Sequence, residues 1–300
     1  MTAIPKPKNV DTPQGLAFAI TAYVLWGFLP LYLKALSHMP PTEVLVHRVI
    51  WSVPVAGAVL IATGRTRDLR AVLTHPRSLI LAFVTASLIS VNWVIYIWAI
   101  GAEQTVEAAL GYYINPLFSI LLGAVLLGES LSRAQWISVL LAAVAVVILT
   151  VETGRLPMVA LGLMLTWGIY AYFKKMLPIG PNQGFLLEVL ILTPPALAYV
   201  VWLQSTGQGH LFSSLWNTIL LVGCGVVTAV PLMFYANGAK LLRLSTIGIL
   251  QYIAPTMIFL VAVLIFKEPF GGAKLVAFPL IWLALVIYTT SMYRQLRGKR

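Results

Sequence analysis

Charged side chains are scarce in this sequence. Asp, Glu, Lys and Arg make up only 10% of its 300 residues, while 60% are hydrophobic, and the mean hydropathy is +0.91. About a quarter of the residues in ordinary soluble domains are charged, so a chain with so few charges cannot cover a water-soluble fold of this size. The composition predicts an all-α integral membrane protein, because a bilayer core requires about 20 apolar residues per helix.

Acidic residues are the scarcer charged type. The chain has 9 Asp and Glu against 20 Lys and Arg, which gives a net charge of +11. In a soluble protein this excess would suggest nucleic-acid binding, but here Lys and Arg fall in short loops, where they set membrane orientation. We expect no nucleic acid as a partner. With the N-terminus inside, 15 basic residues lie on that side and 5 on the other, which predicts cytoplasmic termini at a cell (inner) membrane.

Cysteine and catalytic motifs are nearly absent as well. The single Cys224 cannot form an intrachain disulfide, and one thiol is no metal site. Glu43 and His47 share a helix face as two formal metal ligands, but no third ligand accompanies them at a convincing spacing. The sequence contains no G-x-S-x-G, phosphate-loop or HExxH motif. We expect no metal, no cofactor and no enzymatic activity.

Long apolar runs fill most of the chain. They predict ten transmembrane spans, at 15–36, 44–63, 78–100, 105–127, 132–150, 157–173, 184–203, 215–239, 245–266 and 273–293. The polar residues 1–14 predict a cytoplasmic tail rather than a cleavable signal peptide, because the first apolar run has full spanning length. Residues 294–300 predict a basic cytoplasmic tail.

The apolar runs contain an internal repeat. Residues 109–129, ALGYYINPLFSILLGAVLLGE, align without gaps on residues 248–268, GILQYIAPTMIFLVAVLIFKE, at a shift of 139. Three further pairs match between the halves: Trp26-Gly27 with Trp167-Gly168, Glu43 with Glu188, and Tyr96 with Tyr235. The repeat unit, 15–150 and 157–293, has five spans, an odd number, so the second copy must enter the membrane inverted. The expected fold is two inverted five-helix repeats around a central cavity, which is a common arrangement in transporters.

Two prolines occupy equivalent positions in the repeat. Pro116 and Pro255 lie near the centres of spans 4 and 9, and each removes the hydrogen bond to the carbonyl four residues earlier, at Tyr112 and Gln251. Such carbonyls are tolerated in a membrane only against protein or a water-filled cavity. The paired helix breaks therefore predict a shared central cavity. The competing interpretation is that the prolines only kink the helices for packing.

Aromatic and amide side chains cluster at the same depth. The predicted substrate-binding residues are Trp26, Asn92, Trp93, Tyr96, Tyr112, Asn115, Gln251 and Tyr252. Their rings would bind an apolar or aromatic body, and their amides would supply hydrogen bonds.

Five ionisable residues within or near the spans are candidates for ion coupling or for pairing. They are Lys34, Glu43, His47, Arg48 and Glu107. Ionisable groups inside membranes often mark a pathway, and a proton gradient could couple through Glu107 or His47. The alternative is that the residues near the membrane edge pair with one another or extend to the surface. We interpret Glu129 and Glu268, at span ends, as structural.

Six segments resemble one known family. They are EVLVHRVIWS (43–52), NWVIYIWAI (92–100), EAALGYYINPL (107–117), LGE (127–129), LSTIGILQYIAPTMIFL (244–260) and KEPF (267–270). They resemble RarD-type proteins of the EamA branch of the drug/metabolite transporter superfamily. The resemblance implies ten helices in two inverted EamA-type halves, with helices 1, 3, 4, 6, 8 and 9 around the cavity and helices 5 and 10 at the periphery. The halves differ, because Ala254 stands where the first half has Asn115.

These observations predict a secondary transporter, an exporter of a small metabolite or drug-like solute that works by alternating access. Its partners would be that solute and the lipid bilayer, and the sequence leaves room for a homodimer. Two alternatives remain open at this point. One is an integral membrane enzyme acting on a lipid or quinone through Glu43, His47 and Arg48, and the other is a channel or signalling subunit, although no ring of like charges suggests ion selectivity.

Overall fold

The computed structural model describes residues 12–64, 76–127, 131–177, 179–242, 246 and 250–298, which form helices and no strand. The first half contains α1 (Pro13–Ala35), α2 (Pro41–Ala62), α4 (Pro76–Gly101), α5 (Thr105–Leu127) and α6 (Arg133–Thr153). The second contains α7 (Met158–Met176), α8 (Pro181–Ser205), α9 (Leu215–Lys240), α11 (Ile253–Leu260), the π-helical η1 (Val261–Ile265) and α12 (Lys274–Gly298). Each predicted span overlaps one of these elements. Among the described residues, 7 helices are long and apolar enough to cross a membrane, so the prediction of an all-α integral membrane protein is confirmed.

Short local signals set the helix starts. Thr12 Oγ1 accepts a hydrogen bond from the Gly15 amide at 3.0 Å, and Pro13 occupies the first helical position of α1. Ser132 and Gln135 form a reciprocal capping box at the start of α6. These caps satisfy backbone N–H groups that an apolar environment would leave without water.

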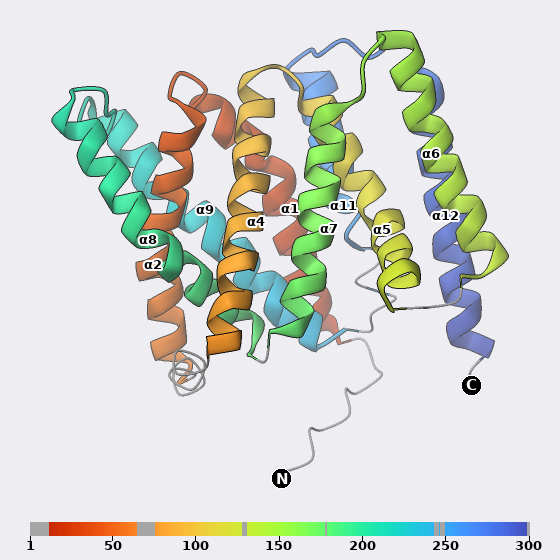
Figure 1. The fold of residues 1–300 in the computed structure, drawn as a ribbon, viewed down its shortest axis with the longest axis horizontal. Coiled ribbons are helices and arrows are strands. Elements are labelled where there is room, and N and C mark those ends of the chain that lie inside the picture. The colour runs from red at the N-terminus through yellow and green to blue at the C-terminus, as the bar shows by residue number, and fades with distance from the viewer. Residues whose placement is uncertain are drawn as a thin grey trace.

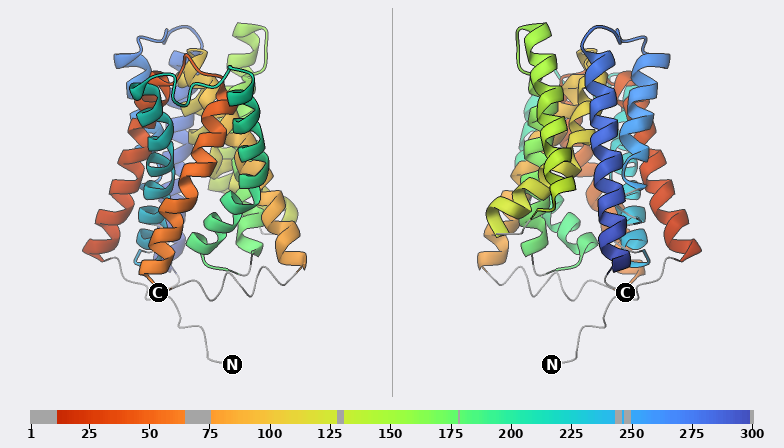
Figure 2. Two further views of the ribbon diagram at one scale, coloured as in Figure 1. Left: turned by 90° about the vertical axis from the view of Figure 1, so that its left-hand side faces the viewer. Right: turned by 90° about the vertical axis from the view of Figure 1, so that its right-hand side faces the viewer.

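The helices form one bundle in which α6 and α12 lie side by side at one edge, while α2, α8 and α9 lie toward the other (Figure 1). A view turned by 90° shows α6 and α12 along one face of the bundle (Figure 2). The described chain begins at α1 and ends at α12, and both of these ends lie at the same end of the bundle.

The helix contacts are paired between the halves. α1 packs against α9 and α11, and its counterpart α7 packs against α4 and α5. Gly27 of α1 lies against Met257 of α11, where an added Cβ would come within 2.6 Å of the Met257 Cβ. Gly168 of α7 lies in the same close contact with Phe118 of α5, and Phe118 and Met257 are 139 residues apart, as the repeat requires. Small residues let membrane helices approach closely, so the same device brings α1 to α11 and α7 to α5.

The two repeat-related prolines occupy different places in their helices. Pro116 lies inside the continuous helix α5, where it removes one backbone hydrogen bond. Pro255 lies in the first turn of α11, directly after a turn at Gln251 and Tyr252. The N–H groups of a first turn have no partner within the helix, so Pro255 interrupts no helical hydrogen bond. The helix is thus broken before Pro255, whereas Pro116 leaves α5 unbroken.

Candidate functional site

A cavity lies at the centre of the bundle and is lined from both halves. It has a volume of about 180 Å³. The lining residues are Tyr23, Trp26 and Leu29 of α1, Arg48 of α2, Ile89, Asn92, Trp93 and Tyr96 of α4, Tyr112 and Asn115 of α5, Trp167 and Tyr170 of α7, Phe185 of α8, Thr228, Leu232 and Tyr235 of α9, and Gln251, Ala254, Pro255 and Ile258 at α11. None of the described lining residues comes from α6 or α12. The six helices that the resemblance placed around a cavity all contribute, and α2 and α8 add one residue each.

The structure brings most of the predicted binding residues together. Seven of the eight line the cavity, and Tyr252 is the one that does not. Of the two prolines, Pro255 lines the cavity and Pro116 does not. Pro255 lies in the first turn of α11, whereas Pro116 lies in the middle of α5, where its neighbour Asn115 lines the cavity instead.

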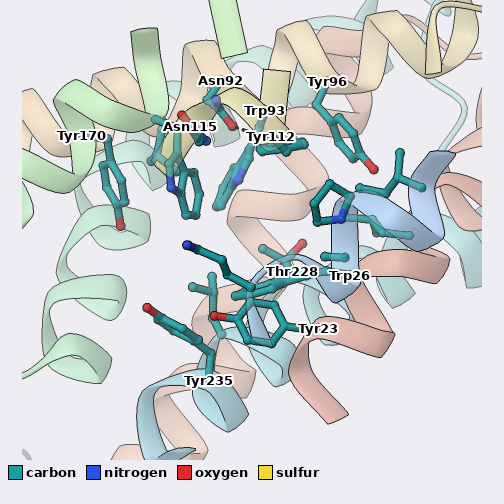
Figure 3. A pocket seen from close by; sticks show the side chains of 18 of the residues that line it. Tyr23, Trp26, Asn92, Trp93, Tyr96, Tyr112, Asn115, Tyr170, Thr228 and Tyr235 are labelled. Carbon is teal, nitrogen blue, oxygen red and sulfur yellow. Dashed lines mark hydrogen bonds between the residues drawn. The ribbon is translucent and has the colours of Figure 1, made fainter. Parts of the chain in front are cut away.

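Two aromatic walls face each other across the cavity (Figure 3). In one wall, the Trp26 ring lies 5.7 Å from Tyr23 and 5.6 Å from Tyr235. In the other wall, Tyr112 lies 5.5 Å from Tyr96 and 6.4 Å from Trp167, and Trp167 lies 5.6 Å from Tyr170. Tilted and edge-to-face contacts of this kind hold rings in fixed orientations. Each wall contains one tryptophan of the repeat-related pair, Trp26 or Trp167.

The two asparagines of the cavity differ in what they bond. Asn92 is fully buried, and its Nδ2 donates to the Leu163 carbonyl oxygen at 3.1 Å and to Thr166 Oγ1 at 2.8 Å. Asn92 therefore ties α4 to α7. Asn115 is also buried, but its Oδ1 has no hydrogen-bond partner among the described residues. A buried polar atom without a partner is costly, so Asn115 Oδ1 is an acceptor whose hydrogen bond the described residues leave unmade.

Arg48 lies at the cavity rather than at the membrane edge. Its side chain is buried, its Nε donates to Thr228 Oγ1 at 3.0 Å, and its Cζ lies 4.6 Å from the centre of the Trp93 ring. Its Nη1 has no partner among the described residues. The alternative that Arg48 extends to the surface does not describe this placement.

Glu43 and His47 have partners of their own. Glu43 accepts two hydrogen bonds from His210, which lies in the connection between α8 and α9: 2.6 Å from the backbone N–H and 2.7 Å to Nδ1. His47 Nδ1 accepts from Trp51 Nε1 at 3.1 Å. Glu43, His47 and Arg48 therefore hydrogen-bond to three different residues instead of to one another, and His47 Nε2 has no hydrogen-bond partner among the described residues.

Glu107 and Lys34 also lie outside the cavity lining. Glu107 Oε1 accepts from the Val159 amide at 2.8 Å, at the start of α7. Glu268 does the same for α5, where it accepts from Thr105 N at 2.8 Å. These carboxylates cap helix N-termini, where negative charge is stabilised. Lys34 pairs with exposed Glu103 at 3.5 Å, and Glu129 lies outside the described residues.

Several lining residues were not among the predicted site residues. Tyr23 lies three positions from Trp26 on the same helix face, and Trp167 and Tyr235 are the repeat counterparts of Trp26 and Tyr96. These three carried a signal in the sequence. Tyr170 and Thr228 carried none, because their positions depend on how α7 and α9 pack against the other half.

The bundle defines a polytopic membrane protein with an internal cavity lined from both halves. Residues 13–151 match the model of the EamA-like transporter family. An "Uncharacterized transporter" of Vibrio cholerae serotype O1 is 43% identical to this chain, over 94% of both chains. A "Protein RarD" of Streptomyces exfoliatus is 42% identical, over 95% of this chain and 91% of the relative. A "Protein RarD" of Escherichia coli (strain K12) is 37% identical, over 97% and 99%.

The chain belongs to the EamA-like transporter family, as a RarD-type protein, which confirms the resemblance found in its sequence. One chain of known crystal structure superposes with a TM-score of 0.60 at 21% sequence identity, covering 94% of this chain and 98% of that one. At this identity the likeness shows the fold alone.

Proposed function

We propose that this protein is a secondary transporter that exports a small metabolite or drug-like solute across the inner membrane. The observation that carries the proposal is the central cavity, which is lined from both halves of the chain by two facing aromatic walls. Solute sites near the midplane between two repeats are typical of secondary transporters. Relatives that are 43% and 37% identical over nearly the whole chain are named as transporters, which supports the same function.

The paired helix contacts support alternating access by two inverted halves with ten spans in all. α1 packs against α9 and α11 in the second half, and α7 packs against α4 and α5 in the first half. These matching contacts allow one half to rock against the other around the cavity. The two repeat-related glutamates, Glu43 and Glu188, each form an ion pair that joins two elements. Glu43 pairs with His210, and Glu188 pairs with Lys174 of α7 at 2.6 Å. In the proposed cycle, these pairs close opposite ends of the bundle.

The two alternatives receive less support. An enzyme would need Glu43, His47 and Arg48 to converge on one substrate, and in the structure they bond to separate partners. An ion channel would need a ring of like charges, and the described cavity lining contains one charged side chain. The basic loops on one side favour the orientation with both termini in the cytoplasm.

A transport assay tests the proposal. The purified protein is first screened by thermal shift against amino acids, aromatic metabolites and amphenicols, since a ligand of the folded state raises the melting temperature. Each compound that stabilises the protein is then loaded into proteoliposomes, and counterflow of its radiolabelled form is measured. We expect counterflow of at least one compound. Proteoliposomes that move none of the stabilising compounds would contradict the proposal.

Two tryptophan variants locate the site of transport. Trp26→Ala and Trp167→Ala each remove the tryptophan ring of one aromatic wall, and a lost ring contact of about 1 kcal/mol corresponds to roughly fivefold weaker binding. The matched control is Trp216→Ala, because Trp216 is exposed near the start of α9 and lies outside the cavity lining. Transport that is equally affected in all three variants would place the site elsewhere.

A further inference from the structure

The cavity contains one charged group and no opposite charge. Arg48 is the only ionisable acid or base other than tyrosine among the described residues that line it. The lining residues that the structure describes include no Asp, Glu, Lys or His. A charge inside a membrane is costly and usually faces an interior where it has a function.

The partners of Arg48 do not neutralise it. Its Nε bonds to the neutral Thr228 hydroxyl, its guanidinium lies over the Trp93 ring, and its Nη1 has no described partner. The ion pairs within the described part of the chain are Lys34–Glu103, Lys174–Glu188 and His210–Glu43, and none includes Arg48. Glu43, on the same helix, is committed to His210. Burying a guanidinium costs desolvation free energy, which an opposite charge at hydrogen-bond distance would offset.

A carboxylate supplies the missing charge and geometry. The guanidinium is planar and presents donors that match the two oxygens of a carboxylate. Thr228 and Trp93 hold the guanidinium in place, which leaves Nη1 as a donor. Tyr96 lines the same cavity, and its hydroxyl also lacks a described partner, so it can donate a further hydrogen bond.

The rest of the cavity suits a flat apolar body. Its volume of about 180 Å³ is more than ten times the roughly 10–15 Å³ that a cavity needs to hold a single water molecule. The facing walls around Trp26 and Trp167 present aromatic rings. An ammonium group would find no carboxylate among the described lining residues and would lie in a cavity that already holds a cation.

We propose that the transported solute is an organic monoanion, a carboxylate on a one- or two-ring aromatic body without an ammonium group, and that Arg48 binds its carboxylate. The proposal rests on the proposed transport function. It distinguishes such an anion from the zwitterionic amino acid and from the amine that carry the same ring.

The test uses four indoles that differ in charge. Indole-3-propionate is the anion, its methyl ester is neutral, tryptamine is the cation and L-tryptophan is the zwitterion. Binding to the detergent-purified protein is measured by calorimetry at neutral pH. A hydrogen bond to a charged group raises affinity by about 10- to 100-fold over a complex that lacks it. We therefore expect the anion to bind about 10- to 100-fold more tightly than the ester, and tryptamine to bind most weakly. Equal binding of anion and ester, or a preference for tryptophan or tryptamine, would overturn the proposal without any variant.

Variants assign the preference to Arg48. We expect Arg48→Gln to reduce the affinity for the anion to that for the ester while the ester binds as before, and Arg48→Lys to restore part of the preference. The matched control is Arg155→Gln, because Arg155 is exposed and outside the cavity lining; it should bind all four indoles as the unaltered protein does. An Arg48→Gln protein that is folded and keeps its preference for the anion would remove Arg48 from the proposal.

Counterflow in proteoliposomes separates this proposal from the transport function. If another compound is transported and no anion binds, the monoanion proposal alone is wrong. If the anion binds and no compound is transported, the site is assigned correctly and the transport function is wrong.

Discussion

The pair formed by Glu43 and His210 should contribute more to stability than any exposed ion pair of this protein. Glu43 is fully buried, and its two oxygens accept from the backbone N–H of His210 at 2.6 Å and contact its Nδ1 at 2.7 Å. Hydrogen bonds to charged groups contribute about 1.5–3 kcal/mol. A double-mutant cycle that combines Glu43→Gln with His210→Ala should therefore give a side-chain coupling energy of about 2 kcal/mol.

The pair of Lys34 and Glu103 provides the comparison. Its atoms are 3.5 Å apart and the Glu103 side chain is 77% exposed, and exposed pairs contribute about 0.2–1 kcal/mol. Both cycles would be measured by reversible unfolding in mixed detergent micelles. A coupling energy for Glu43 and His210 that is no larger than that for Lys34 and Glu103 would refute the conclusion that the buried pair fastens the α8–α9 connection to α2.

Three further predictions follow from close contacts, helix caps and charge distribution. Gly111→Ala should destabilise the protein by about 1–3 kcal/mol, because the new Cβ would lie 2.7 Å from a backbone oxygen of α7. The control is Gly57→Ala, whose new Cβ has nothing within 4 Å and which should be neutral or stabilising in the same unfolding assay. Glu107→Gln should lower stability by about 1 kcal/mol through a weakened α7 cap but leave solute counterflow, measured with and without a pH gradient, as in the unaltered protein. A pH-gradient effect that the unaltered protein shows and the variant loses would instead make Glu107 a coupling residue. In intact cells, a membrane-impermeant maleimide should label Gln208→Cys and not Arg133→Cys. Both positions are exposed, Gln208 follows α8 and Arg133 begins α6, and these two helix ends lie at opposite ends of the bundle (Figure 1). The reverse pattern would invert the proposed topology.

The helical spans could be predicted from local sequence. Apolar runs of spanning length give the helices, since only backbone hydrogen bonds within a segment satisfy its polar groups in lipid. The aromatic cluster could also be predicted in part, because repeat symmetry links Trp26 to Trp167 and Tyr96 to Tyr235.

The interpretation of the ionisable residues depended on contacts that the sequence does not encode locally. Glu43 and Arg48 are five residues apart on one helix, yet one bonds to the α8–α9 connection and the other faces the cavity. Glu107 was a candidate for ion coupling, but in the structure its side chain caps the N-terminus of α7. Each partner is more than 50 residues away in the chain, so only the packed bundle identifies it.

The sequence by itself determined that this chain is a helical membrane protein with an internal repeat, because composition, span length and residue matches at a fixed shift are properties of the linear chain. The tertiary structure alone decided which of the predicted side chains line the cavity and that Asn92 bonds to α7 while Asn115 Oδ1 has no partner among the described residues. It also decided that Arg48 lies there with no counter-charge among the described lining residues. The physical reason is that these properties depend on distances between helices from opposite halves. The contacts of a side chain on a helix face are fixed only when the halves pack together.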